Sequence, residues 1–334
     1  MKLVKYIALI FFSLLWLAGC SGTVASWLYE NNLIKDDYRY GDLYRTSNLP
    51  QFKEVREVCK PLNPEKRKNA HVVIAGDSFT ENGRVEDSDL ATEKYTRVRV
   101  DGSSYVKIDS SDFNVLIIET VERHFRERFN SKWRGVSVEE PAEKPDPGLW
   151  EQFLALEMPY NSQRHETILF GYDLTMKFRE WKALLNYSLF HRVDSDVRLN
   201  GTEEHLLYYL PSEPGISSAF EPIEDTEINN LVANVNEANR YYSELGYDKI
   251  ILSIIPNKTS ILGRDLGVYN DLVKRVQNHP DLEMEVLDSF TPFNKMGSQA
   301  YAKGDTHWSC SGQTIWLEKL NKIILNSSST SEFQ

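Results

Sequence analysis

Short apolar runs and helix-like periodicities alternate along most of this chain. Runs rich in β-branched residues predict buried strands at residues 71–75, 113–118, 249–255 and 284–287. Apolar side chains at helical spacing predict helices at residues 225–245, 272–276 and 315–323. Because helices and apolar strands follow one another in turn, we expect an α/β fold with a mostly parallel sheet covered on both faces.

The pattern changes between residues 139 and 215, which open with a proline-rich stretch. A helix is predicted there, with apolar side chains at Leu174, Phe178, Trp181, Leu185 and Leu189. We therefore expect a helical insertion at 139–215 within an α/β domain formed by 70–138 and 216–326. Residues 21–69 are interpreted as a stalk that packs onto the domain, and 327–334 as a flexible tail. Most tyrosines and tryptophans at helical spacing are expected in the core.

The first twenty residues contain two lysines, an apolar stretch from Tyr6 to Ala18 and then Gly19-Cys20. This order is typical of a secretory signal peptide. The end of the stretch resembles a bacterial lipobox, which implies cleavage before Cys20 and lipidation of its thiol. Alternatively, the segment between Lys5 and Glu30 has no charge and could span a bilayer as one helix. Both interpretations predict a membrane-anchored chain outside the cytoplasm.

The chain is acidic, with 38 Lys+Arg against 49 Asp+Glu and a formal net charge of -11. Proteins that bind nucleic acid neutralise phosphates with lysine and arginine, and no basic run occurs, so we expect no nucleic-acid partner. The chain has three cysteines. If Cys20 carries lipid, Cys59 and Cys310 remain, and they either form one disulfide in an oxidising compartment or stay as buried thiols.

A serine follows the first predicted strand in the sequence Gly76-Asp77-Ser78-Phe79. At the carboxyl end of a parallel strand, a serine on a tight turn can present its hydroxyl, with its own N–H as an oxyanion donor. Serine is a weak nucleophile unless a base lies beside it. The alternative is that Ser78 caps a helix after a Gly-Asp turn.

One of the seven histidines, His307, lies in Asp305-Thr306-His307-Trp308 directly before the last predicted helix. The Asp305 carboxylate could hold the imidazole in one tautomer while its other nitrogen faces a serine. The alternative is a turn-capping aspartate next to a surface histidine. No other acidic or histidine cluster has metal-ligand spacing and no glycine-rich phosphate loop occurs, so we predict neither a metal nor a cofactor.

The Gly-Asp-Ser-Phe strand end and the Asp-Thr-His-Trp stretch at 305–308 together resemble the SGNH/GDSL hydrolase superfamily, especially its branch of polysaccharide O-acetylation proteins. The resemblance implies a three-layer α/β/α sandwich in which Ser78 is the nucleophile. It makes His307 the general base and Asp305 the acid that orients it. The Ser78 N–H, with Gly102 in place of the family's glycine, would form the oxyanion hole.

The resemblance also predicts substrate contacts. The sequence from Glu119 to Arg123 is similar to the Glu-Xaa-Xaa-Glu-Arg stretch of alginate O-acetyltransferases, which implies that Arg123 lies beside the nucleophile. The alternative is a surface arginine paired with a neighbouring glutamate. Lys258 follows the third strand in a Pro-Xaa-Lys sequence, and Trp308 follows the histidine; both are predicted to contact the substrate.

These observations predict an exported serine-dependent O-acyl transferase or esterase that acts on a cell-surface polysaccharide through an acyl-enzyme. Because acetyl-coenzyme A is cytoplasmic, a membrane acyl-shuttling protein is expected as a partner of a transferase. The alternative function is a non-catalytic, SGNH-like domain that binds glycans or serves in assembly.

Overall fold

The computed structural model describes residues 2–21, 24, 27–28, 31, 33–34, 40–43, 46–55, 58–102, 104–138 and 162–326. Its centre is a five-stranded sheet in the order β2-β1-β4-β8-β9, in which every neighbouring pair is parallel. The strands are β1 (Arg67–Gly76), β2 (Thr92–Arg99), β4 (Phe113–Val121), β8 (Lys249–Ile255) and β9 (Glu285–Val286). The predicted α/β fold with a parallel sheet is confirmed.

The central strands are apolar because both faces of the sheet are covered. All nine residues of β4 are buried, and Ile117 in this strand lies opposite Ile74 of β1 and Ile251 of β8. A continuous apolar run is the pattern expected of such a strand. The edge strand β2 has a mixed burial pattern and polar residues, which is why hydrophobic patterning did not predict it.

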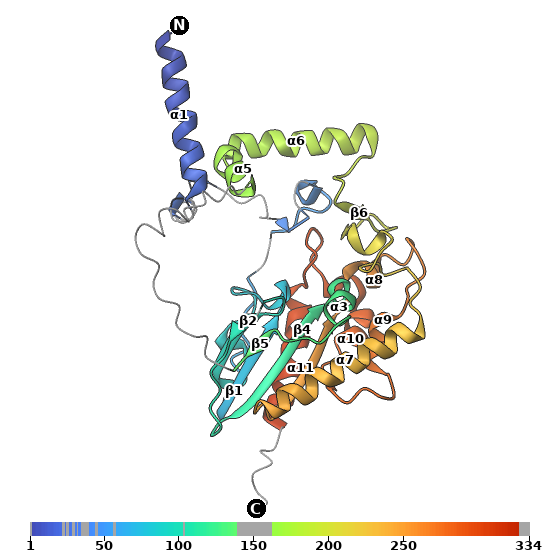
Figure 1. Ribbon diagram of the computed structural model, residues 1–334. Coiled ribbons are helices and arrows are strands. Elements are labelled where there is room, and N and C mark those ends of the chain that lie inside the picture. The colour runs from blue at the N-terminus through green and yellow to red at the C-terminus, as the bar shows by residue number, and fades with distance from the viewer. Residues whose placement is uncertain are drawn as a thin grey trace, which may run out of the picture.

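Helices cover both faces of the sheet and give the three-layer α/β/α sandwich (Figure 1). They are α3 (Glu122–Arg128), α7 (Asp225–Glu244), α8 (Lys258–Leu262), α9 (Leu272–Gln277), α10 (Phe290–Met296) and α11 (Cys310–Asn326). The predicted apolar face of α7 is buried, with Ile228, Val235 and Tyr242 at most 3% exposed. A separate parallel pair joins β3 (Ser104–Tyr105) to β5 (Val136–Ser137).

The described part of the insertion contains two helices and a small sheet. The helices α5 (Ser162–Phe170) and α6 (Asp173–Phe190) precede an antiparallel pair, β6 (Val197–Leu199) and β7 (Leu206–Tyr208). Residues 139–161 of the predicted insertion and the tail at 327–334 lie outside the described residues. Trp181 on α6 is 61% exposed and so departs from the expectation that a tryptophan at helical spacing is in the core.

The N-terminal segment forms the helix α1 (Lys2–Cys20) and then returns to the domain. Within the described part of the chain, Leu3–Cys20 is the only helix long and apolar enough to cross a membrane, a property that signal sequences share. Further along, Leu43, Leu49 and Phe52 are buried in a second apolar cluster with Val197 and Leu206, which are at the insertion's small sheet.

A disulfide joins the N-terminal segment to the last helix. Cys59 and Cys310 are bonded across 251 residues of sequence, so the pairing that the sequence left open is present. Cys310 is the first residue of α11 and lies three positions after His307. The bond therefore ties the end of the N-terminal segment to the helix that follows the predicted base.

Candidate active site

The nucleophile turn begins where β1 ends. Ser78 is the first residue of a single 3-10 turn over Ser78–Thr80, and the Asp77 side chain accepts a hydrogen bond from its N–H at 2.9 Å. The turn is tight at Gly76, because a Cβ there would lie 1.8 Å from the Thr80 hydroxyl. Glycine is therefore required at Gly76 for a close approach rather than for an unusual backbone angle.

The buried carboxylate of Glu119 stabilises this turn through two hydrogen bonds. Glu119, near the end of β4, accepts hydrogen bonds from the Asp77 N–H at 2.7 Å and from the Thr80 hydroxyl at 2.9 Å. Its pKa is raised to about 7, first by burial and then by the negative charge of Asp77. Glu119 thus holds the nucleophile turn in place rather than pairing with Arg123.

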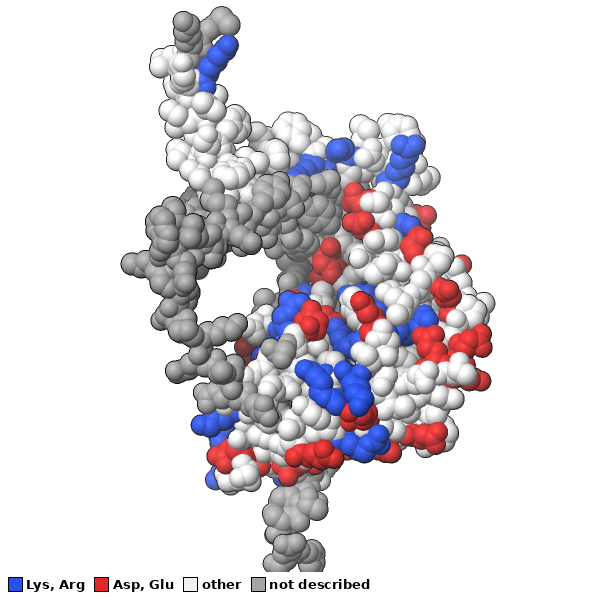
Figure 2. All heavy atoms as spheres, viewed as in Figure 1, with Lys and Arg blue, Asp and Glu red and all other residues white. Residues whose placement is uncertain are grey.

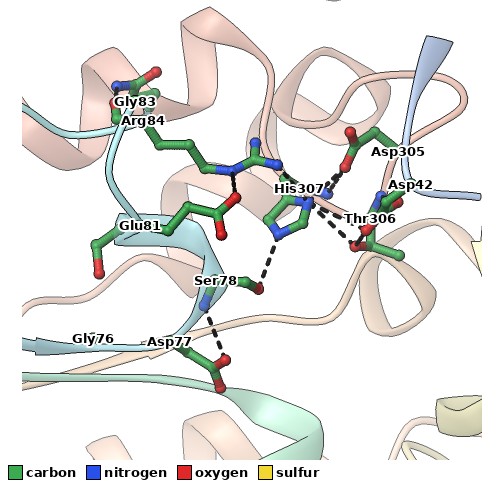
Figure 3. Close-up of polar contacts among 12 residues, drawn as sticks. Asp42, Gly76, Asp77, Ser78, Glu81, Gly83, Arg84, Asp305, Thr306 and His307 are labelled. Atoms are coloured by element: carbon green, nitrogen blue, oxygen red, sulfur yellow. Dashed lines mark hydrogen bonds and ion pairs between the residues drawn. The ribbon is translucent and has the colours of Figure 1, made fainter. Parts of the chain in front are cut away.

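Ser78, His307 and Asp305 form a continuous hydrogen-bonded chain (Figure 3). The His307 Nε2 lies 2.9 Å from the Ser78 Oγ, and its Nδ1 lies 2.6 Å from the Asp305 Oδ1. The same Asp305 oxygen accepts the His307 backbone N–H at 2.9 Å. The structure brings together the three residues predicted as nucleophile, base and orienting acid, although they lie up to 229 positions apart in sequence.

The partners of His307 determine its tautomer. An ionised aspartate only accepts hydrogen bonds, so Nδ1 carries the proton and Nε2 is left to accept the serine hydroxyl. Burial lowers the pKa of His307, but the hydrogen bond to Asp305 and the charge of Asp42 outweigh it, so the pKa is raised. Burial raises the pKa of Asp305, but the bond to His307 outweighs this and the pKa is lowered.

Asp42 is a second carboxylate at the imidazole, and the sequence analysis did not identify it. Its Oδ2 lies 3.3 Å from the His307 Nδ1, and it also accepts the Thr306 hydroxyl. Its Oδ1 accepts the Thr306 N–H at 2.6 Å. Asp42 therefore holds the residue between Asp305 and His307 at two points, as Figure 3 shows.

Backbone contacts hold Asp42 against the histidine loop, the segment at residues 302–309 that carries His307. Gly41 has a φ of +130°, and a Cβ there would lie 2.1 Å from the Gly304 carbonyl oxygen. The Leu43 N–H donates to that same oxygen at 3.2 Å. Nothing local marks Gly41-Asp42 as functional in the sequence, because its role depends on contact with a loop more than 260 residues away.

Arg84 is a cation at the imidazole that was also not predicted. Its Nη2 lies 3.2 Å from the His307 Nδ1, and its Nε donates to Glu81 at 2.9 Å. Because Nδ1 carries a proton, it cannot accept a hydrogen bond from Arg84. Burial raises the pKa of Asp305, and the hydrogen bond and charge of His307, together with the smaller effect of the Arg84 charge, lower it.

Lys258 supports the histidine loop from the start of α8. Its ammonium group donates to the backbone carbonyls of Ala302, Lys303 and Asp305 at 2.6, 2.9 and 3.0 Å. Burial lowers its pKa to about 7, against the opposing charge of Asp305. These bonds use all three donors of the ammonium group, so Lys258 positions the loop in this structure and has no donor left for the predicted substrate contact.

Arg123, at the first turn of α3, is half-buried and has a different setting. Its guanidinium lies 5.6 Å from the centre of the Tyr208 ring, and no hydrogen bond or ion pair joins it to another described residue. Burial lowers its pKa, while the charges of Asp77 and Asp42, which flank Ser78 and His307, act in the opposite direction. The geometry leaves this cation able to bind an anionic or developing charge.

Trp308 and Gly102, the other predicted contacts, take structural positions. Trp308 is 5% exposed and its ring packs edge-on against Phe79, with the ring centroids 5.1 Å apart. The Gly102 N–H donates to the Arg99 carbonyl at 3.3 Å in the turn after β2. The Ser78 N–H is bound to Asp77, so both predicted oxyanion donors are occupied within the protein.

Asp42, Asp305 and His307 also form a group whose ligand atoms lie within 4.8 Å of one another. In this arrangement the atoms already bind one another or Thr306: the proton on Nδ1 joins His307 to Asp305, and Asp42 accepts two hydrogen bonds from Thr306. The group therefore matches the hydrogen-bond pattern of a base and its orienting acids better than it matches a metal site, which uses unprotonated nitrogen.

Comparison with families of proteins, with curated proteins and with solved structures gave no match to this chain. The case for function therefore depends on the arrangement of Ser78, His307 and Asp305 at the carboxyl end of a parallel sheet.

Proposed function

We propose that this protein is a serine-dependent acyl-transfer enzyme, an O-acetyltransferase or esterase of the SGNH type that acts on a cell-surface polysaccharide. The observation that carries the proposal is the Ser78–His307–Asp305 hydrogen-bonded chain. A nucleophile, a base within hydrogen-bond reach and a third group that orients the base together favour nucleophilic catalysis.

The geometry supports a two-step mechanism. The Ser78 Oγ attacks the carbonyl carbon of an acyl ester while the His307 Nε2 accepts the hydroxyl proton. Asp305 and Asp42 stabilise the imidazolium cation that results. The imidazolium then gives the proton to the departing alkoxide as the C–O bond of the ester breaks. The alkoxide leaves as an alcohol, and the acyl group remains on Ser78 as an acyl-enzyme.

In the second step, His307 takes a proton from an incoming hydroxyl, which attacks the acyl-enzyme. A sugar hydroxyl gives an acylated glycan, and water gives a free acid. Arg123 supports this proposal because its half-buried guanidinium makes no hydrogen bond or ion pair with a described residue and can bind the negative charge that develops on the acyl oxygen or an anionic group of the glycan.

The apolar helix α1 supports an exported, membrane-tethered protein. Cleavage before Cys20 would leave a lipid anchor, and an uncleaved α1 would span the bilayer. A transferase outside the cytoplasm has no access to acetyl-coenzyme A, so the proposal includes a membrane protein that supplies the acyl group.

A specific observation favours a second candidate, a non-catalytic glycan-binding or assembly domain. Both predicted oxyanion donors, the N–H groups of Ser78 and Gly102, are already bound within the protein. Without donors for the oxyanion, a serine nucleophile loses about 100- to 1000-fold in rate for each missing hydrogen bond. In this alternative the turn would be retained for its shape.

Intact-mass spectrometry separates the two candidates. The full chain in mild detergent is incubated with p-nitrophenyl acetate, beside Ser78→Ala and the control Ser110→Ala, which changes an exposed serine. The enzyme proposal predicts an acetyl adduct of about 42 Da in the parent and the control but not in Ser78→Ala. Equal adduct formation and equal ester consumption in all three proteins would refute the acyl-enzyme on Ser78.

A further inference from the structure

The helix α6 has a row of large apolar side chains that points away from the protein. Its members are 42 to 69% exposed: Leu174, Phe178, Trp181, Leu184, Leu185 and Leu189. Most of them recur every three or four positions, so they form one stripe along the helix. A continuous exposed stripe of this kind marks an interaction surface rather than scattered surface residues.

This outer stripe is separate from the face that holds α6 to the domain. On the inner face Met176 is 1% exposed, and Ala183 and Tyr187 pack against the cluster that contains Phe52 and Leu206. A helix needs only one apolar face to dock onto its own domain. The second apolar face is therefore available for a different partner.

Basic side chains accompany the outer stripe. Lys177 and Lys182 are exposed, while Glu180, the acidic residue between them, lies 3.9 Å from Lys53 of the N-terminal segment. Figure 2 shows that the edge of the molecule along α6 is mainly uncharged with blue basic groups, although the protein as a whole is acidic. Aromatic and aliphatic side chains flanked by lysine are typical of helices that lie in the surface of a membrane.

The position of α1 identifies the partner of this stripe. The helix α5 packs against the C-terminal turns of α1, where the His165 Nε2 lies 3.1 Å from the Trp16 carbonyl oxygen and 3.8 Å from the Cys20 Sγ. Only two residues separate α5 from α6. In Figure 1, α6 lies beside α1 and is oriented roughly at right angles to it. A helix perpendicular to a membrane span lies parallel to the membrane.

We propose that the outer stripe of α6 binds the surface of the lipid bilayer that α1 or the Cys20 lipid enters, and holds the domain against that surface. Both fates of the N-terminus lead to the same plane, because Cys20 is the last residue of α1. This inference goes beyond the proposed catalytic function and does not require it.

The attachment has a consequence for the site. The carboxyl ends of the strands, where Ser78 lies, point toward the side of the domain that carries α6 (Figure 1). A domain held by α6 therefore presents Ser78 on its membrane-facing half. Such an orientation suits an acyl donor delivered from within the bilayer.

Fluorescence quenching tests the inference in the full chain. A Cys20→Ser background leaves only the Cys59–Cys310 pair, so bimane labels a cysteine introduced by Leu185→Cys or, separately, by Phe178→Cys. Glu318→Cys, at an exposed position of α11, is the matched control. Each protein is placed in vesicles of phosphatidylethanolamine and phosphatidylglycerol, with and without brominated acyl chains, and in detergent.

We expect brominated lipid to quench the labels at Leu185→Cys and Phe178→Cys and not the label at Glu318→Cys. Aqueous iodide should quench the control but lose most of its effect on the α6 labels in vesicles. Iodide quenching of the α6 labels that equals the control would overturn the proposal. Labels on α6 that are shielded from both quenchers would also overturn the proposal, because that outcome means that protein covers the stripe. If this shielding increased with protein concentration, the covering protein would be a second copy of the chain.

Discussion

The disulfide between Cys59 and Cys310 should contribute a large part of the stability of the domain. The perturbation is the double substitution Cys59→Ser with Cys310→Ser, compared with Cys20→Ser, which removes a cysteine outside the bond. The bond closes a loop of 251 residues that includes every strand of the central sheet. Removal of the bond therefore increases the conformational entropy of the unfolded chain more than the loss of any local contact would.

The magnitude follows from the loop length. In the chain-entropy treatment, the cost of closing a loop grows with the logarithm of its length, and 251 residues correspond to about 5.5 kcal/mol at 25 °C. Removal of native disulfides typically costs about 2–5 kcal/mol, so the calculated value is an upper bound. That loss is comparable to the whole stability of many domains, which is about 5–15 kcal/mol.

Equilibrium unfolding in urea, in mild detergent with tryptophan fluorescence, measures the loss. We expect the midpoint for the double variant to fall by an amount equivalent to at least about 2 kcal/mol, and the Cys20→Ser control to match the parent. We expect little change in the activity of the double variant at low urea, because Asp42 is held to the histidine loop by Thr306 and Gly304 and not by the disulfide. An unchanged midpoint in the double variant would refute the loop-entropy argument.

Three further predictions concern groups at or below the site. Asp42→Asn should lower the pKa of His307, since the Asp42 charge helps to raise it, and should therefore move the acidic limb of the kcat/KM profile to lower pH; a merely structural effect would lower the rate without moving the limb. Glu119→Gln should flatten the dependence of stability on pH. The pKa of Glu119 is raised from 4.5 to about 7 by burial and the Asp77 charge, so the parent is stabilised below pH 4.5 and loses about 3 kcal/mol as pH rises through 7, as urea unfolding at several pH values would detect. Lys258→Met should leave the carbonyls of Ala302, Lys303 and Asp305 without their donor and lower the free energy of unfolding by about 3 kcal/mol; an unchanged unfolding midpoint would contradict its role in the loop.

The fold could be predicted where hydrophobic patterning is strong. The strand predicted at 249–255 matches β8 at both ends, and the run at 113–118 lies within β4. The edge strand β2 was missed because polar residues predominate in it and its buried and exposed positions do not alternate regularly. Exposure of the α6 stripe was missed for the opposite reason: an apolar helical face reads the same whether protein or membrane covers it.

The candidate site divides in a similar way. Ser78, Asp305 and His307 lie in short local sequences, so their types and order indicate their chemistry before their contacts are known. Asp42 and Arg84 lack such a local pattern, because each reaches His307 only through the folded chain. The role of Lys258 could not be predicted either, because it depends on tertiary structure: three carbonyls of one loop accept hydrogen bonds from its ammonium group.

The same long-range contacts connect the N-terminal segment to the site. The N-terminal segment begins at the apolar helix α1, places Asp42 on His307 and ends at Cys59, which is bonded to the helix that follows His307. The segment that would tether the protein under the proposed function therefore also supplies a carboxylate beside His307. A purely mechanical linker would need neither the close approach of Gly41 to Gly304 nor a carboxylate within 3.3 Å of the imidazole. For this reason, a version of the protein that begins after Asp42 should keep the Ser78–His307 pair and show a lower pKa of His307, measured from the acidic limb of its kcat/KM profile, because Asp42 is one of the groups that raise this pKa.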